Sequence, residues 1–486
     1  MATRFRRSAA LLDALAAGWL PGMPVSGRPA EPIVDPIPEK IPMSELVLDA
    51  VPFVRAPRTT DSSTLAVNDA WARIQYLAPI PDDSGRLVFN DTRGLLYLTD
   101  TSGTAPAVFL DLRKYGGFGF DDSMFPNESG LAGFAFHPDF ARKGAPGYGR
   151  FYIAYSARSG TGTADYLDGD AASHESVIRE WTMADPGASR FSGSSREILR
   201  IGQFAPNHNV GTLAFNPSAE PGEADYGMLY ACFGDGGAAN DPRDYGQSLA
   251  EPLGAVIRID PLGGAHPSRY AVPPDNPFVG QRERAAEIWA YGLRHPQHLS
   301  WDGATGRLYI TDIGQNQIEE INLGERGANY GWRLREGTFA TAFAHRGTAP
   351  GPVFARPAED PLPFVYPVAQ YDHDEGNAVS SGFVYRGSRI PELQGRYLFT
   401  DLVRGRLFYI ETETLQPGRP APIREIGLRV DGQERTLLEA AGMPNTYAPG
   451  LRVDLRLGQD AAGELYLLTK SDGWIRRLDP LGKNPG

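Results

Sequence analysis

Two short segments of this sequence carry residues suited to proton transfer. In residues 207–209, His208 stands between two asparagines just before an apolar run, a setting typical of an exposed loop. Imidazole accepts a proton near neutral pH, so His208 is a candidate general base. Residues 234–237 read Gly-Asp-Gly-Gly and end the hairpin that begins after His208. Because a hairpin returns its end beside its start, Asp235 is expected to orient His208 through the second ring nitrogen.

Taken singly, each of these segments has an ordinary alternative, either a solvated histidine or a tight turn with a capping aspartate. A further segment supplies a cation. Arg294 follows a predicted strand and stands on a turn fixed by Pro296. Its permanently charged guanidinium donates to carbonyl oxygens and carboxylates, although a surface salt bridge explains it equally well.

Residues 311–322 begin Thr-Asp-Ile-Gly-Gln-Asn and offer side-chain and carbonyl oxygens. Such oxygens are the ligands that Ca²⁺ prefers. The segment lacks the regular aspartate spacing of an EF-hand, so on its own it indicates a metal only weakly.

These segments need a scaffold, and a repeated strand pattern indicates one. An apolar strand, a turn containing Gly or Pro, and an aromatic-rich strand recur six times. The copies lie at residues 86–100, 133–155, 213–231, 299–312, 382–401 and 454–468. One hairpin cannot bury both faces, whereas six hairpins around an axis bury one another and leave few exposed edges. We predict an all-β fold, a six-bladed β-propeller with four-stranded antiparallel blades, in preference to a β-sandwich.

Long insertions are expected between the blades, where they carry function. Their predicted positions are residues 156–205, 238–285 and 333–380. The composition agrees with one large all-β unit, because 56 Gly and 41 Pro punctuate short segments of the 486-residue chain. We expect a single propeller domain over residues 61–486, preceded by a leader in residues 1–60.

The formal net charge of −12 argues against a nucleic-acid partner, whose phosphates need a basic face. Cys232, the single cysteine, lies in an apolar run and is expected to be a buried, inert strand residue. No stretch after the N-terminus reaches the ~18 apolar residues that a membrane helix needs. We expect no membrane span, and a monomer or a homodimer.

The beginning of the chain resembles an export signal. Arg4, Arg6 and Arg7 precede an apolar stretch that runs to Leu20 and is interrupted by Asp13. A charged start followed by an apolar run is typical of secretory signals. A periplasmic or secreted protein is therefore expected, with a disordered tail as the alternative.

Taken together and in this order, the segments resemble the glucose/sorbosone dehydrogenase family, which includes soluble aldose dehydrogenases. The resemblance covers about residues 85 to 480. Besides residues 207–209 and 234–237, the matching stretches are 128–140, 253–260, 273–278, 291–294, 312–316 and 327–332. Each stretch is modest alone, but the ordered set is specific.

This resemblance implies a dehydrogenase that uses pyrroloquinoline quinone (PQQ) and Ca²⁺ at the mouth of the propeller channel, together with an external electron acceptor. His208, held by Asp235, would take the proton of an aldose's anomeric hydroxyl while hydride passes to the quinone. Arg294 would polarise a quinone oxygen. The further residues implied are Glu128 and Asn207 for the sugar, Gln297 for PQQ, and the backbone carbonyls of Gly314 and Gln315 for calcium.

Three departures from the family pattern concern the cofactor. His295 stands where the family has Asn, Val403 stands where it has a cofactor-facing Lys, and Val453 lies where it pairs arginines. PQQ carries three carboxylates, so losing cations threatens its binding more than the fold. The residues that would compensate are Arg404, Arg406, Arg452 and Arg456. Two alternatives stay open: a non-catalytic propeller that binds carbohydrate or protein, and a quinone-free, calcium-dependent lactonase or lyase.

Overall fold

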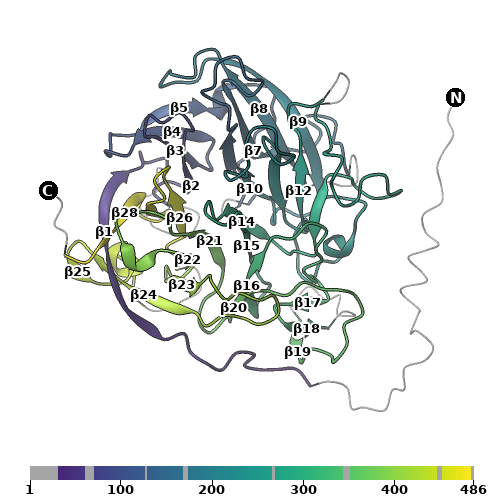
Figure 1. The fold of residues 1–486 in the computed structure, drawn as a ribbon, viewed down its shortest axis with the longest axis vertical. Helices are drawn as coiled ribbons and strands as arrows, with labels where there is room; N and C mark the ends of the chain where they lie inside the picture. The colour runs from purple at the N-terminus through teal and green to yellow at the C-terminus, as the bar shows by residue number, and fades with distance from the viewer. Residues whose placement is uncertain are drawn as a thin grey trace.

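The computed structural model describes residues 31–60, 70–125, 128–167, 173–264, 269–342, 351–445 and 451–482. Within these ranges, six sheet units stand around a common axis (Figure 1). The first strand of each unit contacts the first strand of the next, and the sixth contacts the first. The ring is therefore closed, and the predicted six-bladed propeller is confirmed.

The first four blades are four-stranded and antiparallel. From the channel outward, the first blade consists of β2 (Ile74–Pro79), β3 (Arg86–Asp91), β4 (Leu95–Asp100) and β5 (Ala107–Asp111), and the second of β6 (Leu131–Phe136), β7 (Arg150–Arg158), β8 (His174–Met183) and β9 (Gly193–Gln203). In the same order, the third blade consists of β10 (Val210–Phe215), β11 (Leu229–Phe233), β12 (Ala255–Ile259) and β13 (Ile288–Tyr291), and the fourth of β14 (Pro296–Trp301), β15 (Leu308–Asp312), β16 (Ile318–Leu323) and β20 (Ala369–Asp372). Neighbouring blades cover both faces of the inner strands, which is why these strands read as apolar runs rather than as alternating patterns.

The fifth and sixth blades share one nine-stranded sheet. Its strands are β21 (Val379–Val384), β22 (Arg396–Asp401), β23 (Leu407–Glu411), β24 (Arg424–Val430), β25 (Gln433–Glu434), β26 (Leu455–Gln459), β27 (Leu465–Thr469), β28 (Trp474–Pro480) and β1 (Met43–Arg55). The N-terminal strand β1 pairs antiparallel with β28 and parallel with β24, and Figure 1 shows it along the outside of both. It therefore completes the sixth blade and ties it to the fifth.

Strand β1 changes the expected domain boundary. Residues 43–55 were assigned to a leader, but the structure places them inside the propeller, because Leu48 and Ala50 are buried in its core. The many prolines of residues 21–60 give this part of the chain the composition of an extended leader. Pro52 lies in β1 where the register with β28 shifts, a position at which a strand tolerates proline.

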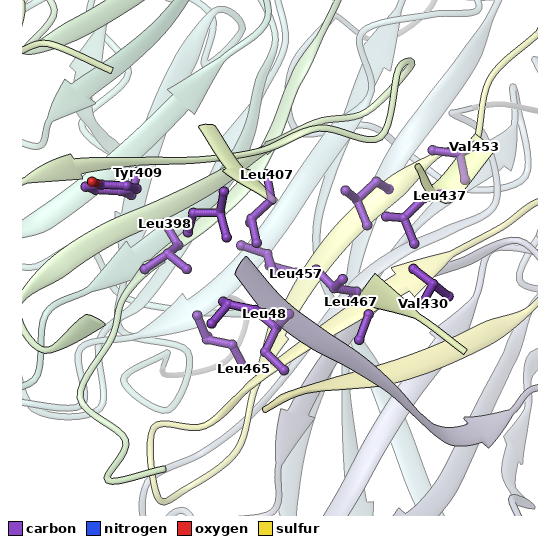
Figure 2. Packing of buried hydrophobic residues seen from close by; sticks show 14 of the residues in the cluster. Leu48, Leu398, Leu407, Tyr409, Val430, Leu437, Val453, Leu457, Leu465 and Leu467 are labelled. Carbon is purple, nitrogen blue, oxygen red and sulfur yellow. The ribbon is translucent and has the colours of Figure 1, made fainter. Parts of the chain in front are cut away.

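The apolar cluster that β1 covers is contributed by the fifth and sixth blades. Leu48 of β1 packs with Leu398 and Leu407 of the fifth blade and with Leu465 and Leu467 of the sixth (Figure 2). Each of these side chains is almost fully buried, and burying one leucine stabilises a fold by roughly 1.5–3 kcal/mol. The fifth and sixth blades are therefore held together by apolar packing as well as by their pairing with β1.

Five of the six predicted hairpins are the first two strands of a blade, and in the first blade the predicted hairpin is β3–β4. The insertion predicted at 156–205 is wrong in part, because it contains β8 and β9 of the second blade. The insertion was inferred from the uneven spacing of the repeated hairpins, and that spacing does not record the outer strands of a blade. Ion pairs such as Arg196 with Glu180 join β8 and β9. Cys232 is buried as expected, and burial raises the pKa of its thiol to about 12.

The insertions predicted at 238–285 and 333–380 are wrong in part too, because they contain β12 of the third blade and β20 of the fourth. Several connections between blade strands carry short elements. These are the 3-10 helices η2 (Leu112–Lys114), η3 (Tyr245–Gln247) and η4 (Pro391–Leu393), the helix α2 (Leu437–Ala440), and a three-stranded sheet of β17 (Arg335–Glu336), β18 (Phe339–Thr341) and β19 (Val353–Phe354). In the part of the chain that the structure describes, no helix is long and apolar enough to cross a membrane. The predicted export signal lies outside the described residues.

Candidate active site

The fold gathers the candidate residues at one mouth of the channel. Neighbouring inner strands run in the same direction, since Gln75 near the start of β2 donates to the carbonyl of Ala132 near the start of β6. Thr212 in β10 likewise donates to the carbonyl of Gln297 in β14. Residues that precede an inner strand therefore lie at one end of the ring. The connections between second and third strands return to that same end, because the second strand is antiparallel to the first.

His208 and Asp235 form a buried pair at this mouth. His208 precedes β10 and Asp235 follows β11, and Nδ1 of the imidazole lies 2.6 Å from Oδ1 of the carboxylate. The side chain of Asp235 is fully buried, and His208 is 3 % exposed. The expectation of an exposed histidine is therefore wrong, because residues from other blades cover it. The predicted contact between the two side chains is present.

The surroundings set the charge states of this pair. Burial lowers the pKa of His208, and the nearby charge of Arg294 lowers it further. Burial by itself raises the pKa of Asp235, but the charge and hydrogen bond of His208 and the charge of Arg294 hold it below its ordinary value. At neutral pH the pair is therefore a neutral imidazole beside a carboxylate. Trp332 Nε1 and the N–H of Gly237 also donate to Asp235, at 2.8 and 2.9 Å.

Glu128 and His295 hold His208 from the other sides. The backbone of His208 has a φ of 56°, a left-handed conformation that costs a non-glycine residue roughly 1–2 kcal/mol. Its N–H donates to Oε2 of Glu128 at 2.7 Å, which fixes this conformation. The ring of His295 stacks on that of His208, with centroids 4.8 Å apart and planes inclined by 24°.

His295 begins a row of polar contacts that reaches the sixth blade. Arg456 Nη1 donates to Oε1 of Gln297 at 2.8 Å, so Gln297 turns its amide N–H towards Nε2 of His295, 2.6 Å away. Oε2 of Glu128 lies 3.1 Å from the same nitrogen. Nδ1 of His295 is buried and has no hydrogen-bond partner among the described residues.

Arg294 points at carbonyl oxygens rather than into a surface salt bridge. Its Nη1 donates to the carbonyls of Ile313 at 3.0 Å and Gly314 at 2.6 Å. Asp312 positions this segment, since its carboxylate accepts the N–H groups of Arg294 and His295 at 2.9 and 2.7 Å. Burial raises the pKa of Asp312 to about 7.

Three other predicted site residues, Asn207, Gln315 and Arg404, form hydrogen bonds with neighbouring parts of the protein. Oδ1 of Asn207 accepts the N–H of Ala238 at 3.1 Å, and the side chain of Gln315 bonds Asn240. Arg404 donates to the carbonyls of Asp374 and His373 at 2.7 and 2.9 Å.

On the sixth blade, Arg452 pairs with Asp454 through Nε at 2.7 Å. Val453 is fully buried in the apolar cluster below the mouth, so a packing role explains its departure from the family pattern.

Sequence reasoning missed one cation at the mouth. Lys470 follows β27, and burial lowers its pKa to about 7. An apolar strand followed by one lysine gives no signal that the side chain turns inward.

A six-bladed propeller with this arrangement at its mouth is of the sugar dehydrogenase-like class. The sequence model described as Glucose / Sorbosone dehydrogenase matches residues 72–441, which is most of the chain. The chain therefore belongs to the glucose/sorbosone dehydrogenase family.

The similar proteins include one named as a sugar dehydrogenase and one whose name describes no enzyme. The HIPL1 protein of Arabidopsis thaliana is 28% identical over 447 residues, which cover 83% of this chain and 61% of HIPL1. Aldose sugar dehydrogenase YliI of Escherichia coli K12 is 25% identical over 281 residues, covering 57% of this chain and 63% of that protein. The chain thus spans about three fifths of the length of these curated relatives.

Among solved structures, the PQQ-bound aldose sugar dehydrogenase of Streptomyces coelicolor matches with a TM-score of 0.53 at 22% identity. The match covers 84% of this chain and 94% of that one. A likeness at this identity shows the shared fold.

The chemistry of the mouth fits both a carboxylated cofactor and a hard cation. Nε of buried Arg456 has no hydrogen-bond partner within the described ranges, and a carboxylate there would satisfy it. The carbonyls of Ile313 and Gly314 converge on one cation, which is the ligand type of Ca²⁺. A Cβ at Gly314 would lie 1.7 Å from the carbonyl oxygen of Ile318, so the turn requires glycine there. The described residues contain no group of three or more His, Cys, Asp or Glu side chains that could hold a metal ion.

Proposed function

We propose that this protein is a PQQ- and calcium-dependent dehydrogenase that oxidises the anomeric hydroxyl of an aldose, or a related sugar aldehyde, and passes the electrons to an external acceptor. The observation that carries the proposal is the buried contact of His208 with Asp235, beside the guanidinium of Arg294. Family membership supports the same class of reaction.

In the proposed reaction the imidazole is the base. Asp235 keeps the proton of neutral His208 on Nδ1, so the lone pair of Nε2 is available for the sugar's hydroxyl proton. Once His208 is protonated, the carboxylate stabilises the imidazolium. PQQ, when bound, supplies the two-electron acceptor, with Arg294, Gln297 and Arg456 as the residues proposed to hold it. Gly314 and Gln315 are proposed to hold calcium through their carbonyls, and the structure supports adding Ile313.

The remaining roles follow from position at the mouth. Glu128, next to both imidazoles, and Asn207 are proposed to contact the sugar. Arg404 and Arg452 are proposed as further cofactor partners, which requires each to exchange a present contact. Export to the periplasm or the medium remains part of the proposal.

A non-catalytic propeller that binds carbohydrate or protein is the second candidate. The observation that favours it is the closed state of the mouth, where His208 and His295 are each 3 % exposed. Val403 and Val453, in place of cationic residues, point the same way because they reduce the attraction for three carboxylates.

The deciding experiment is a titration of the purified protein with PQQ and Ca²⁺, followed by dye reduction with a panel of aldoses. We expect a change in the visible spectrum at micromolar PQQ and turnover with at least one sugar. His208→Ala should keep the spectral change and lose dye reduction. His137→Ala is the matched control, because His137 is a buried histidine that follows β6 and so lies at the opposite end of its blade.

Two outcomes would contradict the proposal. A spectrum that stays unchanged at micromolar PQQ supports the binding propeller instead. Unchanged turnover in His208→Ala removes His208 from its role as base.

A further inference from the structure

One carboxylate accepts hydrogen bonds from the backbone N–H groups of the turn proposed to bind calcium. Oε1 of Glu336 accepts the backbone N–H groups of four successive residues. These are Gln315, Asn316, Gln317 and Ile318, at 2.8, 3.2, 3.0 and 3.2 Å. Successive N–H groups that converge in this way form a concave anion site. Here the anion is a side chain of the protein itself.

The carbonyls of the residues just before this turn face the opposite way. Ile313 and Gly314 direct their oxygens at Nη1 of Arg294, 3.0 and 2.6 Å away. The turn is therefore polar in one direction, with an anion at its N–H side and a cation at its carbonyl side. A negative charge on the N–H side stabilises the orientation in which the carbonyls point into the mouth.

Glu336 reaches the turn from outside the blade. It belongs to β17, in the small separate sheet inserted between β16 and β20 of the fourth blade, and its side chain is almost fully buried. A buried carboxylate is costly unless hydrogen bonds satisfy it, and the four N–H groups supply them. The contact thus fixes the turn relative to a second structural unit.

We propose that Glu336 is a positioning residue for the cation site, one that holds the carbonyls of Ile313 and Gly314 in the orientation that binds Ca²⁺. This inference rests on the proposed calcium dependence and names the residue that prepares the site for the ion. Groups behind a metal's ligands typically change metal affinity by about 10- to 100-fold when they are mutated.

The test compares Ca²⁺ binding by the whole protein and its Glu336→Gln variant, measured by calorimetry without PQQ or sugar. Gln keeps the size of the side chain but removes the charge, so Ca²⁺ should bind at least about tenfold more weakly. Terbium luminescence sensitised by Trp332 localises the binding, because the ring of Trp332 lies 5.7 Å from the guanidinium carbon of Arg294.

Glu464→Gln is the matched control. Glu464 is also buried, and its Oε1 accepts two successive backbone N–H groups, those of Ser388 and Arg389 at 2.9 and 3.0 Å, in a different part of the ring. Its loss should alter thermal stability without changing Ca²⁺ affinity. If Glu336→Gln does not fold, Glu336→Asp serves instead, since the shorter side chain keeps the charge but not the reach, and weaker binding is again expected.

The outcomes separate this inference from the proposed function. Equal Ca²⁺ affinity in the wild type and the folded Glu336 variant overturns the role of Glu336 and leaves the dehydrogenase standing. A wild type that binds no Ca²⁺ at this site overturns both the positioning role and the calcium dependence. An equal loss of affinity in Glu464→Gln overturns the inference too, because the effect would then be general.

Discussion

Asp235→Asn is the substitution that tests the proposed chemistry most directly. Oδ1 of Asp235 accepts from both His208 Nδ1 and the N–H of Gly237, while Oδ2 accepts from Trp332. An amide has one oxygen, so it serves either the first two donors or the third. Facing His208 with its oxygen, Asn keeps the tautomer but loses the charge. Facing His208 with its N–H₂, it forces the proton onto Nε2 and removes the base.

The size of the effect follows from the contact. The Nδ1–Oδ1 distance is 2.6 Å, and the charges of imidazolium and carboxylate are centred about 4 Å apart. At an effective dielectric constant of about 20, their attraction is about 4 kcal/mol. Since about 1.4 kcal/mol is a factor of ten, removing the charge should lower kcat about 10³-fold. The wrong tautomer would lower kcat about 10⁴-fold, which is the loss that an Asp→Asn substitution causes in a Ser-His-Asp triad.

The assay is dye reduction by protein loaded with PQQ and Ca²⁺, followed as a function of pH. Burial lowers the pKa of His208, whereas the charge of Asp235 raises it. In the wild type, activity should appear as the pH rises through the pKa of His208. Without the charge of Asp235 that pKa falls further, so the residual activity of the variant should begin at lower pH.

Asp241→Asn is the matched control for this experiment. Asp241 is buried in the same connection between β11 and β12, and burial raises its pKa to about 8. It is therefore mostly uncharged at pH 7, and replacing it with Asn should change turnover little. If Asp235→Asn keeps more than about a tenth of the wild-type turnover, or its acidic limb moves upward, the base assignment is refuted.

Two further predictions concern the cofactor and the ring. Arg456→Met should weaken PQQ binding about 10- to 100-fold in a spectral titration, because a hydrogen bond to a charged group contributes about 1.5–3 kcal/mol. An unchanged affinity would exclude Arg456 from the cofactor site. Leu48→Ala should lower the free energy of unfolding by about 2–5 kcal/mol in urea, whereas Met43→Ala, at a residue that is 57 % exposed, should stay within about 0.5 kcal/mol. Equal effects at both positions would show that β1 does not join the fifth and sixth blades through its apolar side.

The propeller could be predicted because its repeat is local. Each hairpin joins strands that are close in sequence, such as β10 and β11, so the pattern of apolar residues and turns is visible within about twenty residues. Strand β1 could not be found in this way. Its partner β28 lies more than 400 positions downstream, as the pairing of Ala50 with Leu478 shows, and no local pattern records such a contact.

In the candidate site, too, contacts between residues close in sequence could be predicted, and contacts between distant residues could not. The contact of His208 with Asp235 was predictable because one hairpin joins the two residues. The burial of His208 was not, since Glu128 and His295 come from other blades. Glu336 gave no signal either, because it lies in a two-residue strand of an insertion and acts on backbone N–H groups, which have no sequence pattern.

The position of Arg294 links the closed mouth to the proposed calcium site. Its guanidinium now makes the two carbonyl contacts that Ca²⁺ would make, and a cation at those oxygens must displace it. Asp312 holds only the backbone of Arg294, so the side chain is able to turn while its N–H stays fixed. A displaced guanidinium carries its donors to another acceptor at the mouth, and an incoming quinone oxygen or carboxylate is such an acceptor. Calcium and cofactor would then bind cooperatively. Calcium would free the guanidinium of Arg294 for the cofactor, and the cofactor would give the displaced guanidinium a new acceptor.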